Sequence, residues 1–213
     1  YEFANAGELM RDYEGWTPED FKKYQEWMAY VFFPSNVYFL KNRNGTLAEG
    51  YPAHYWSNWG LCNVLSVMSI GILCDDPFIY NWGVSYYKYN LTGTFKDYVD
   101  PSSSTEIICR GFTEYIGNLV VDRFTNDEIP YGYWGQMQES GRDQGHALMA
   151  LGLAIDVAQT GWNQGDDLFA FMNNRLAAGI EYQAAHAAYQ WGNTEGVAPE
   201  NLPWVKYIRM YYP

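Results

Sequence analysis

Apolar residues recur at helical spacing along most of the chain, and polar segments separate these stretches. Thr17 and Asp76 each stand directly before a proline, an arrangement typical of a helix N-cap. The segment 56–74 is almost continuously apolar, so we expect a helix there that is buried on most sides. Together these signals predict helices over about 17–33, 56–74, 77–89, 105–121, 140–160 and 167–188.

The segments between the predicted helices are long and polar. Pro34 predicts the end of the first helix, and 35–55 and 90–104 have the composition of connections. No segment keeps a period-two alternation, so we expect little sheet. This order predicts an all-α fold of helical hairpins, an α/α toroid or part of one, as a single domain over residues 1–213; a plain helical bundle is the alternative.

The composition is that of a folded chain, with 48% hydrophobic and 18% charged residues. Aromatic residues reach 19%, which suits a packed core or a surface for sugar rings. The net charge of −12 is a poor match for nucleic acid or an anionic membrane, so we expect neither as a partner. A local cationic pocket can still hold an anionic substrate. The sequence has no phosphate loop, dinucleotide fingerprint or GxSxG motif, so no cofactor is expected.

The three cysteines do not have the spacing of a metal site. Cys62, Cys74 and Cys109 form no CxxC pair, so we expect no bound zinc. Cys62 and Cys74 stand on one predicted helix, about 18 Å apart at 1.5 Å per residue, which is too far for a disulfide between them. Any disulfide would therefore involve Cys109.

Two glycosylation sequons begin at Asn44 and Asn90. They are compatible with a secreted, extracellular glycoprotein. The sequence starts at Tyr1 without a signal peptide or an initiator Met, so we expect a processed chain, a trimmed chain or a fragment.

The densest polar cluster is Gln136–His146, at the start of the predicted helix 140–160. Helical spacing places six residues on one stripe: Glu139, Arg142, His146, Met149, Leu153 and Asp156. Because this stripe begins polar and becomes mostly apolar, we expect its start at a mouth and its end in a core. The helix N-terminus and Arg142 both favour a bound carboxylate. The alternative is a capping cluster with an internal Glu139–Arg142 ion pair. Gln138, Glu139 and Gln144 are candidate substrate contacts.

A second cluster runs from His54 to Gly60 and leads into the apolar helix. Asn58 offers an amide donor to a carboxylate, and Trp56 and Trp59 offer planes for stacking. We assign His54, Tyr55, Trp56 and Trp59 as candidate substrate contacts. The alternative is that Asn58 caps the helix and the tryptophans are core residues.

Four blocks of sequence resemble the alginate lyase domain proteins: 58–62 with 70–76, 138–146, 162–168 and 174–182. The resemblance runs from about Phe3 to Tyr182 and points to the secreted α/α-toroid polysaccharide lyases. Family thirty-eight is most similar, and family five is a more distant relative. Members are longer at both ends, so the resemblance implies that this chain is a segment of a longer protein and has other segments of that protein as partners.

The resemblance implies β-elimination on a polyuronate, an anionic polysaccharide such as alginate or glucuronan. In these lyases an Asn and an Arg commonly neutralise the uronate carboxylate. Asn58 and Arg142 match these two positions, and the resemblance implies that His146, one turn after Arg142, carries the proton. The chain departs from the family pattern in two places. Asn58 is followed by Trp59 rather than His, and Leu148-Met149 replaces a Tyr. His54, Tyr55 and Tyr133 are the stand-ins for the missing base and acid.

Two other functions are compatible with the same residues. A glycoside hydrolase needs two carboxylates on opposite sides of a sugar, and Glu139 and Asp143 are too close together on one predicted helix to flank one. An inactive sugar-binding fragment would keep the aromatic residues and hold Arg142 in ion pairs.

Overall fold

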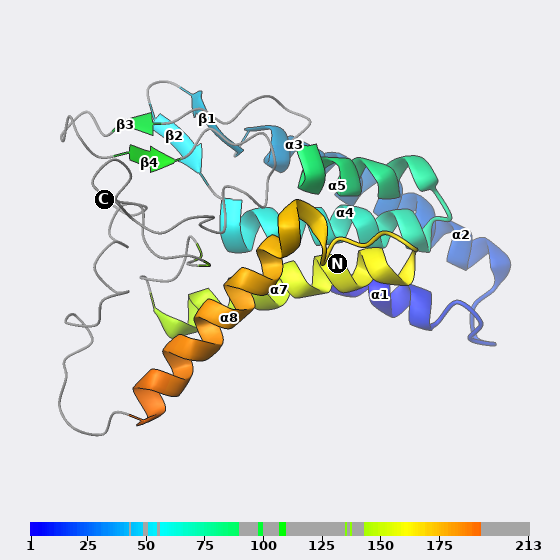
Figure 1. Ribbon diagram of the computed structural model, residues 1–213. Helices are drawn as coiled ribbons and strands as arrows, with labels where there is room; N and C mark the ends of the chain where they lie inside the picture. Colours follow the sequence, from blue (N-terminus) through cyan, green and yellow to red (C-terminus); the bar gives the residue numbers. More distant parts are fainter. Residues whose placement is uncertain are drawn as a thin grey trace. The chain divides into compact units, whose positions relative to one another are not determined.

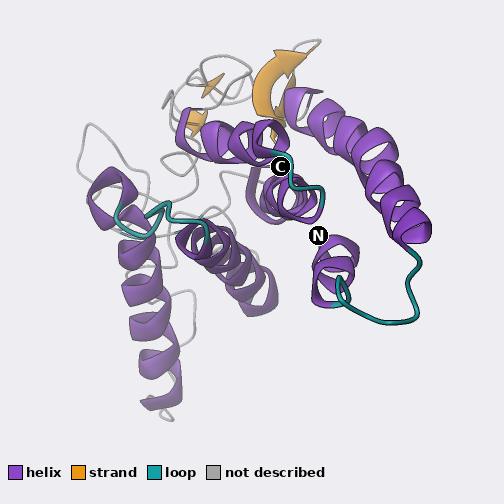
Figure 2. Cartoon of the chain, turned by 90° about the vertical axis from the view of Figure 1, so that its right-hand side faces the viewer, coloured by secondary structure: helices purple, strands orange, loops and turns teal. Residues whose placement is uncertain are grey.

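The computed structural model describes residues 1–42, 44–48, 51–54, 56–89, 98–99, 107–109, 135, 137 and 143–192 (Figure 1). The chain divides into two compact units, Tyr1–Gly93 and Thr94–Pro213. Helices account for most of the described residues, and the strands among them form two two-stranded sheets (Figure 2). Within the described part of the chain, no helix has both the length and the apolar character needed to cross a bilayer.

The first unit surrounds one apolar helix. Its elements in chain order are α1 (Glu2–Leu9), α2 (Pro18–Trp27), η1 (Met28–Phe32), α3 (Phe33–Asn42), β1 (Asn44–Ala48), β2 (Tyr51–His54), η2 (Trp56–Gly60), α4 (Leu61–Leu73) and α5 (Pro77–Tyr89). Helix α4 packs against α1, α3 and α5. Most of its residues are buried, including Leu61, Val64 and Met68. The prediction of a helix buried on most sides is therefore confirmed for α4.

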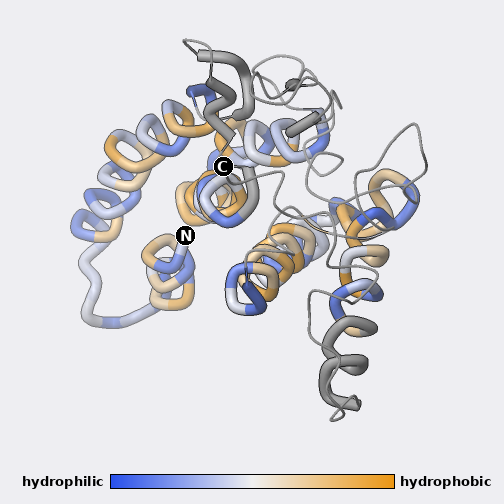
Figure 3. Tube along the Cα trace, turned by 90° about the vertical axis from the view of Figure 1, so that its left-hand side faces the viewer, coloured by the Kyte–Doolittle hydropathy of each residue, from blue (hydrophilic) through white to orange (hydrophobic). Residues whose placement is uncertain are grey.

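Helices α2 and α3 form one unbroken helix that leads into β1, joined by the π-helical turn η1 (Figure 2). Hydrophobic and hydrophilic residues alternate along it (Figure 3). Its N-cap is Thr17, which accepts a 3.1 Å hydrogen bond from the Asp20 N–H, as the sequence predicts.

The predicted helix end at Pro34 is wrong, because α3 continues through it to Asn42. A proline inside an α-helix removes one N–H and its ring crowds the carbonyl four residues earlier. Here the π-helical turn ends two residues before Pro34, and the Phe33 N–H bonds the Met28 carbonyl, five residues back. The Ser35 hydroxyl donates to the Val31 carbonyl at 2.8 Å. These two bonds pair backbone groups on either side of the carbonyl that the proline leaves without its helical donor. The predicted connection 35–55 is instead helix to Asn42, followed by the β1–β2 hairpin.

Helices α4 and α5 form a tight hairpin. Asp76 caps α5 by accepting hydrogen bonds from the N–H groups of Phe78 at 2.9 Å and Ile79 at 3.2 Å, as predicted. Gly71 allows the close approach of the two helices, since a Cβ at this position would lie 2.6 Å from the Tyr80 Cα. The stacked rings of Trp82 and Tyr86 extend the apolar contact on α5.

The second unit contains β3 (Tyr98–Val99), β4 (Ile107–Cys109), α7 (Gln144–Asn163) and α8 (Phe171–Gly192). Helix α7 packs against α8 and buries a face rich in small residues, namely Ala147, Ala150, Ala154, Ala158 and Gly161. Asp167 accepts a hydrogen bond from the Ala170 N–H at 3.0 Å just before α8. Within α8, Met172–Asn174 have positive φ, so the regular helix begins after them.

The predicted helix over 105–121 is wrong at 107–109, where β4 pairs with β3 in an antiparallel ladder. Ile107 and Ile108 are β-branched, which favours the strand. The remainder of that predicted helix lies outside the described residues. The predominance of helix among the described residues confirms the predicted all-α class. The toroid arrangement and the single domain stay predictions.

Candidate functional site

Asn58 and Trp59 lie on η2, the π-helical turn before α4, and differ sharply in exposure. Asn58 is only 5% exposed, whereas Trp59 is 63% exposed. The Trp59 ring stacks on Phe39 with centroids 6.2 Å apart and an interplanar angle of 18°. Phe39 thus supports one side of an indole that remains largely open to solvent, which is the arrangement that a sugar-stacking residue requires.

The remaining predicted residues of this cluster are placed only in part. His54 ends β2 and Trp56 begins η2, but their side chains lie outside the described part of the chain. Tyr55 lies outside it altogether, and so do four residues of the second unit: Tyr133, Gln138, Glu139 and Arg142. The predicted meeting of Asn58 with Arg142 in one pocket therefore stays a prediction.

At the start of α7, one carboxylate holds both the helix end and a histidine ring. Asp143 is the N-cap, and its Oδ1 accepts the backbone N–H of His146 at 2.8 Å. Its Oδ2 lies 2.6 Å from Nδ1 of the same histidine. The histidine side chain is 33% exposed and that of Asp143 50%. Gln144, the first residue of the helix, is exposed beside them.

This geometry orients the imidazole of His146. An ionised carboxylate only accepts hydrogen bonds, so its short contact with Nδ1 requires a proton on that nitrogen. In the neutral ring, Nε2 then carries the lone pair and can take up a proton. A carboxylate that fixes the tautomer of a histidine in this way is a recurring part of proton-transfer sites.

Two expectations about this helix are wrong. Helix α7 begins at Gln144, so Glu139 and Arg142 precede its N-cap and share no helical stripe with His146. The rest of the stripe does not run into a core either, because Met149 is 47% exposed and Asp156 is exposed, with only Leu153 buried. The buried face of α7 is the small-residue face instead.

The N-terminus of α7 also differs from a site ready to bind an anion. The carboxylate of Asp143 occupies the position where an external carboxylate would meet the helix N–H groups. A uronate would therefore have to find its donors elsewhere. Among the described residues, no group of three or more acidic, His or Cys side chains has the arrangement of a metal site.

One family model matches the N-terminal part of the chain. Residues 2–97 match the family model for alginate lyase. The matched range contains Asn58, Trp59 and the block 70–76, and so confirms the resemblance over that range. The blocks at 138–146, 162–168 and 174–182 lie beyond the match. Searches of curated proteins and of solved structures each found nothing that matches the chain.

The orienting role of Asp143 was missed by sequence reasoning, although the signal for it is present. Asp143 and His146 stand at N-cap and N3, the two positions that exchange hydrogen bonds in a capping box. The usual N3 residue is Glu or Gln, whereas a histidine at N3 places its ring on the N-cap carboxylate. Asp-x-x-His at a helix start is thus a readable sign of an oriented imidazole.

Proposed function

We propose that the protein is a polysaccharide lyase that cleaves a polyuronate of the alginate or glucuronan type by β-elimination. The observation that carries this proposal is the match of residues 2–97 to the alginate lyase family. That family suggests a lyase with a polysaccharide substrate. The Asp143–His146 pair adds a group suited to moving a proton.

In the proposed reaction the acidic proton is the proton on C5, the carbon that carries the uronate carboxylate. Asn58 and Arg142 donate to the carboxylate and so stabilise the negative charge that develops when the proton leaves. Nε2 of His146 takes the C5 proton, and the electron pair forms the C4=C5 double bond. The bond from C4 to the glycosidic oxygen breaks, and that oxygen leaves with a proton supplied by Tyr55 or Tyr133.

Asp143 supports this step without touching the substrate. As the Nδ1–H partner of His146, it holds the tautomer in which Nε2 is a base. It also stabilises the imidazolium that forms once the proton has arrived. Asp143 is therefore a positioning residue in this proposal.

The substrate is expected to lie along exposed aromatic and amide side chains. Trp59 provides the best supported platform, because its ring is open to solvent and backed by Phe39. The other proposed contacts are His54, Tyr55, Trp56, Tyr133, Gln138, Glu139 and Gln144. Since the chain carries a net charge of −12, Arg142 provides the local positive charge that a polyuronate needs. A secreted, extracellular protein fits such a substrate.

The mass of the products tests the proposal. Elimination adds no water, so each cleavage leaves an unsaturated uronate at the new non-reducing end, and the product that carries it is lighter by one water than the corresponding hydrolysis product. We expect these lighter products from a responsive polyuronate, and their loss in His146→Gln, which cannot carry the proton. Products that have gained water would identify a glycoside hydrolase and refute the elimination.

A further inference from the structure

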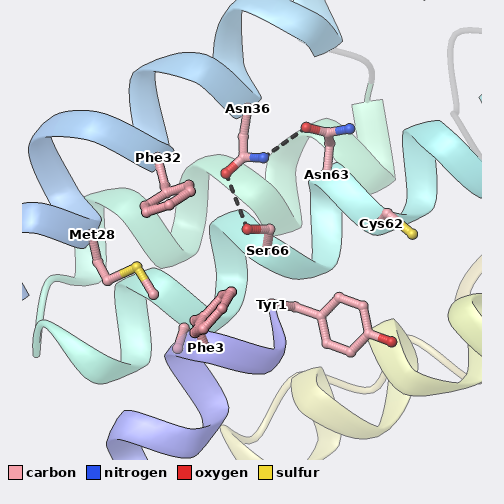
Figure 4. A pocket seen from close by; sticks show the side chains of 9 residues that line it. Tyr1, Phe3, Met28, Phe32, Asn36, Cys62, Asn63 and Ser66 are labelled. Carbon is pink, nitrogen blue, oxygen red and sulfur yellow. Dashed lines mark hydrogen bonds between the residues drawn. The ribbon is translucent and has the colours of Figure 1, made fainter.

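A cavity of about 240 Å³ lies in the first unit, and Trp59 is not among the residues that line it. Figure 4 shows it between α1, the α2–α3 helix and α4. Pockets for drug-sized ligands start at about 300 Å³. The cavity is therefore large enough for a single small ring and too small for an oligosaccharide.

One wall of the cavity is polar and internally bonded. The Asn36 amide donates to Oδ1 of Asn63 at 2.7 Å, and its oxygen accepts from the Ser66 hydroxyl at 3.0 Å. Nδ2 of Asn63 donates in turn to the Trp59 carbonyl at 2.8 Å. These bonds fix the orientation of both amides. Each amide has a second N–H and further acceptor capacity, so the wall offers donors and acceptors side by side.

The facing wall is apolar. It is formed by Met28 and Phe32, at the two ends of the π-helical turn, and by Phe3 and Ala4 of α1. Met28 and Ala4 are buried, whereas Phe3 is 65% exposed. An aromatic ring held open at a cavity is able to stack on a flat apolar face of a ligand.

The cavity offers an acidic ligand no cationic side chain. None of the described side chains that line it carries a formal charge. Cys62, which also lines it, has a thiol whose pKa is raised mainly by burial, while the α-ammonium of Tyr1 lowers this pKa and the Glu2 carboxylate raises it. These two charges act on the thiol in opposite directions, and the described lining contains no guanidinium or lysine ammonium to bind a carboxylate.

We propose that this cavity is a binding site for a neutral pyranose, with the sugar face on Phe3 and Phe32 and its hydroxyl groups on Asn36, Asn63 and Ser66. Sugar hydroxyls both donate and accept, which matches the mixed polar wall. The site is separate from the proposed uronate chemistry, because none of the residues proposed for that chemistry lines the cavity. It does not depend on the elimination reaction.

Protection of Cys62 from alkylation tests the proposal, with Cys74 as an internal control. Both cysteines are free and partly buried, but only Cys62 lines the cavity. Burial also raises the pKa of the Cys74 thiol, to about 11, so labelling with iodoacetamide at about pH 9 is slow at both thiols. Mass spectrometry then gives the rate at each position in the same sample.

The probes are methyl β-glucopyranoside and its matched uronate, the methyl glucuronide. At ten times its Kd, the neutral glycoside should slow alkylation of Cys62 about tenfold and leave Cys74 unchanged. Equal protection by the glucuronide, equal slowing at Cys74 or no protection would each overturn the proposal. A neutral gluco-oligosaccharide added in a parallel sample distinguishes the source. Protection by it indicates that the terminal sugar of a glycan enters the cavity, and protection by the methyl glycoside alone indicates a free sugar.

Two exposed phenylalanines give a matched pair of variants. Phe3→Ala removes the ring at the cavity and should weaken the protection by the glycoside several-fold. Phe78→Ala removes a ring of similar exposure, 70%, from α5 outside the cavity and should leave the protection unchanged. If the glycoside protects Cys62 equally well in both variants and in the parent protein, Phe3 does not contact a sugar and the proposed site is wrong.

Discussion

Replacing Asp143 with Asn separates the two tasks of this carboxylate. Asn is as good an N-cap as Asp, and its side-chain oxygen can still accept the His146 N–H. The other half of the amide is an NH₂ group, which would face Nδ1 of the ring. Nδ1 would then have to accept a hydrogen bond, and the proton would move to Nε2.

The structure sets the expected magnitudes. The helix cap remains in Asp143→Asn, so the loss of stability should not exceed about 1 kcal/mol, the scale of a charge at a helix end. The catalytic loss should be much larger, because a general base contributes about 10²–10⁴ in rate and the variant holds the wrong tautomer. Asp143→Ala should lose the activity and, in addition, about 1 kcal/mol of stability from the missing cap.

The assay compares kcat, thermal stability and the ¹⁵N spectrum of the imidazole for both variants. Asp167→Asn is the matched control, since Asp167 also accepts the N–H of the residue three positions on, that of Ala170, but no histidine of the described residues contacts its other oxygen. We expect the control to cleave at the parental rate. The spectrum should show Nδ1 protonated in the parent and Nε2 protonated in Asp143→Asn.

Parental activity in a folded Asp143→Asn variant would rule out the positioning role of Asp143. It would show that the tautomer of His146 does not matter to the reaction and that Asp143 acts only as a cap.

Three further outcomes follow from the described contacts and the proposed roles. Asn58→Ala should lower the rate of cleavage by about 10²–10³ with little change in KM, measured on a responsive polyuronate, and near-normal activity would remove it from the site. Gly71→Ala should reduce the free energy of unfolding by about 1–3 kcal/mol, because the new methyl group would overlap the backbone of Tyr80; unchanged denaturant unfolding would contradict this. Burial raises the pKa of the Tyr87 phenol above its ordinary value, so the stability that depends on the neutral phenol is present below about pH 10 and should be lost as the pH rises further. In an alkaline titration, Tyr87→Phe should therefore unfold at a higher pH than the parent protein.

The sequence predicted α4 and α5 well because their signals are local. Asp76 and Pro77 mark a helix start that needs no tertiary context, and an unbroken apolar run leaves a central helix as its stable environment. The helix through Pro34 could not be predicted in the same way. Its continuation depends on a π-helical turn, in which each bond reaches one residue further back than the α-helical pattern assumes.

The candidate site was predictable in part for a similar reason. His146 was found because it stands in a polar cluster, but the predicted helix begins near 140 rather than at Gln144. With Asp143 as the N-cap, Arg142 precedes the helix, and the cap contacts the histidine ring. The stacking of Trp59 on Phe39, in contrast, joins two different helices, and no local pattern encodes that contact.

Ultraviolet absorbance of the unsaturated uronate tests the central claim most directly. The protein is incubated with alginate, polymannuronate, polyguluronate, glucuronan and a neutral glycan, and the absorbance of the C4=C5 double bond is followed beside the release of reducing ends. We expect a rise in both signals on at least one polyuronate and none on the neutral glycan. Reducing ends without the absorbance, or no cleavage of any polyuronate, would contradict it.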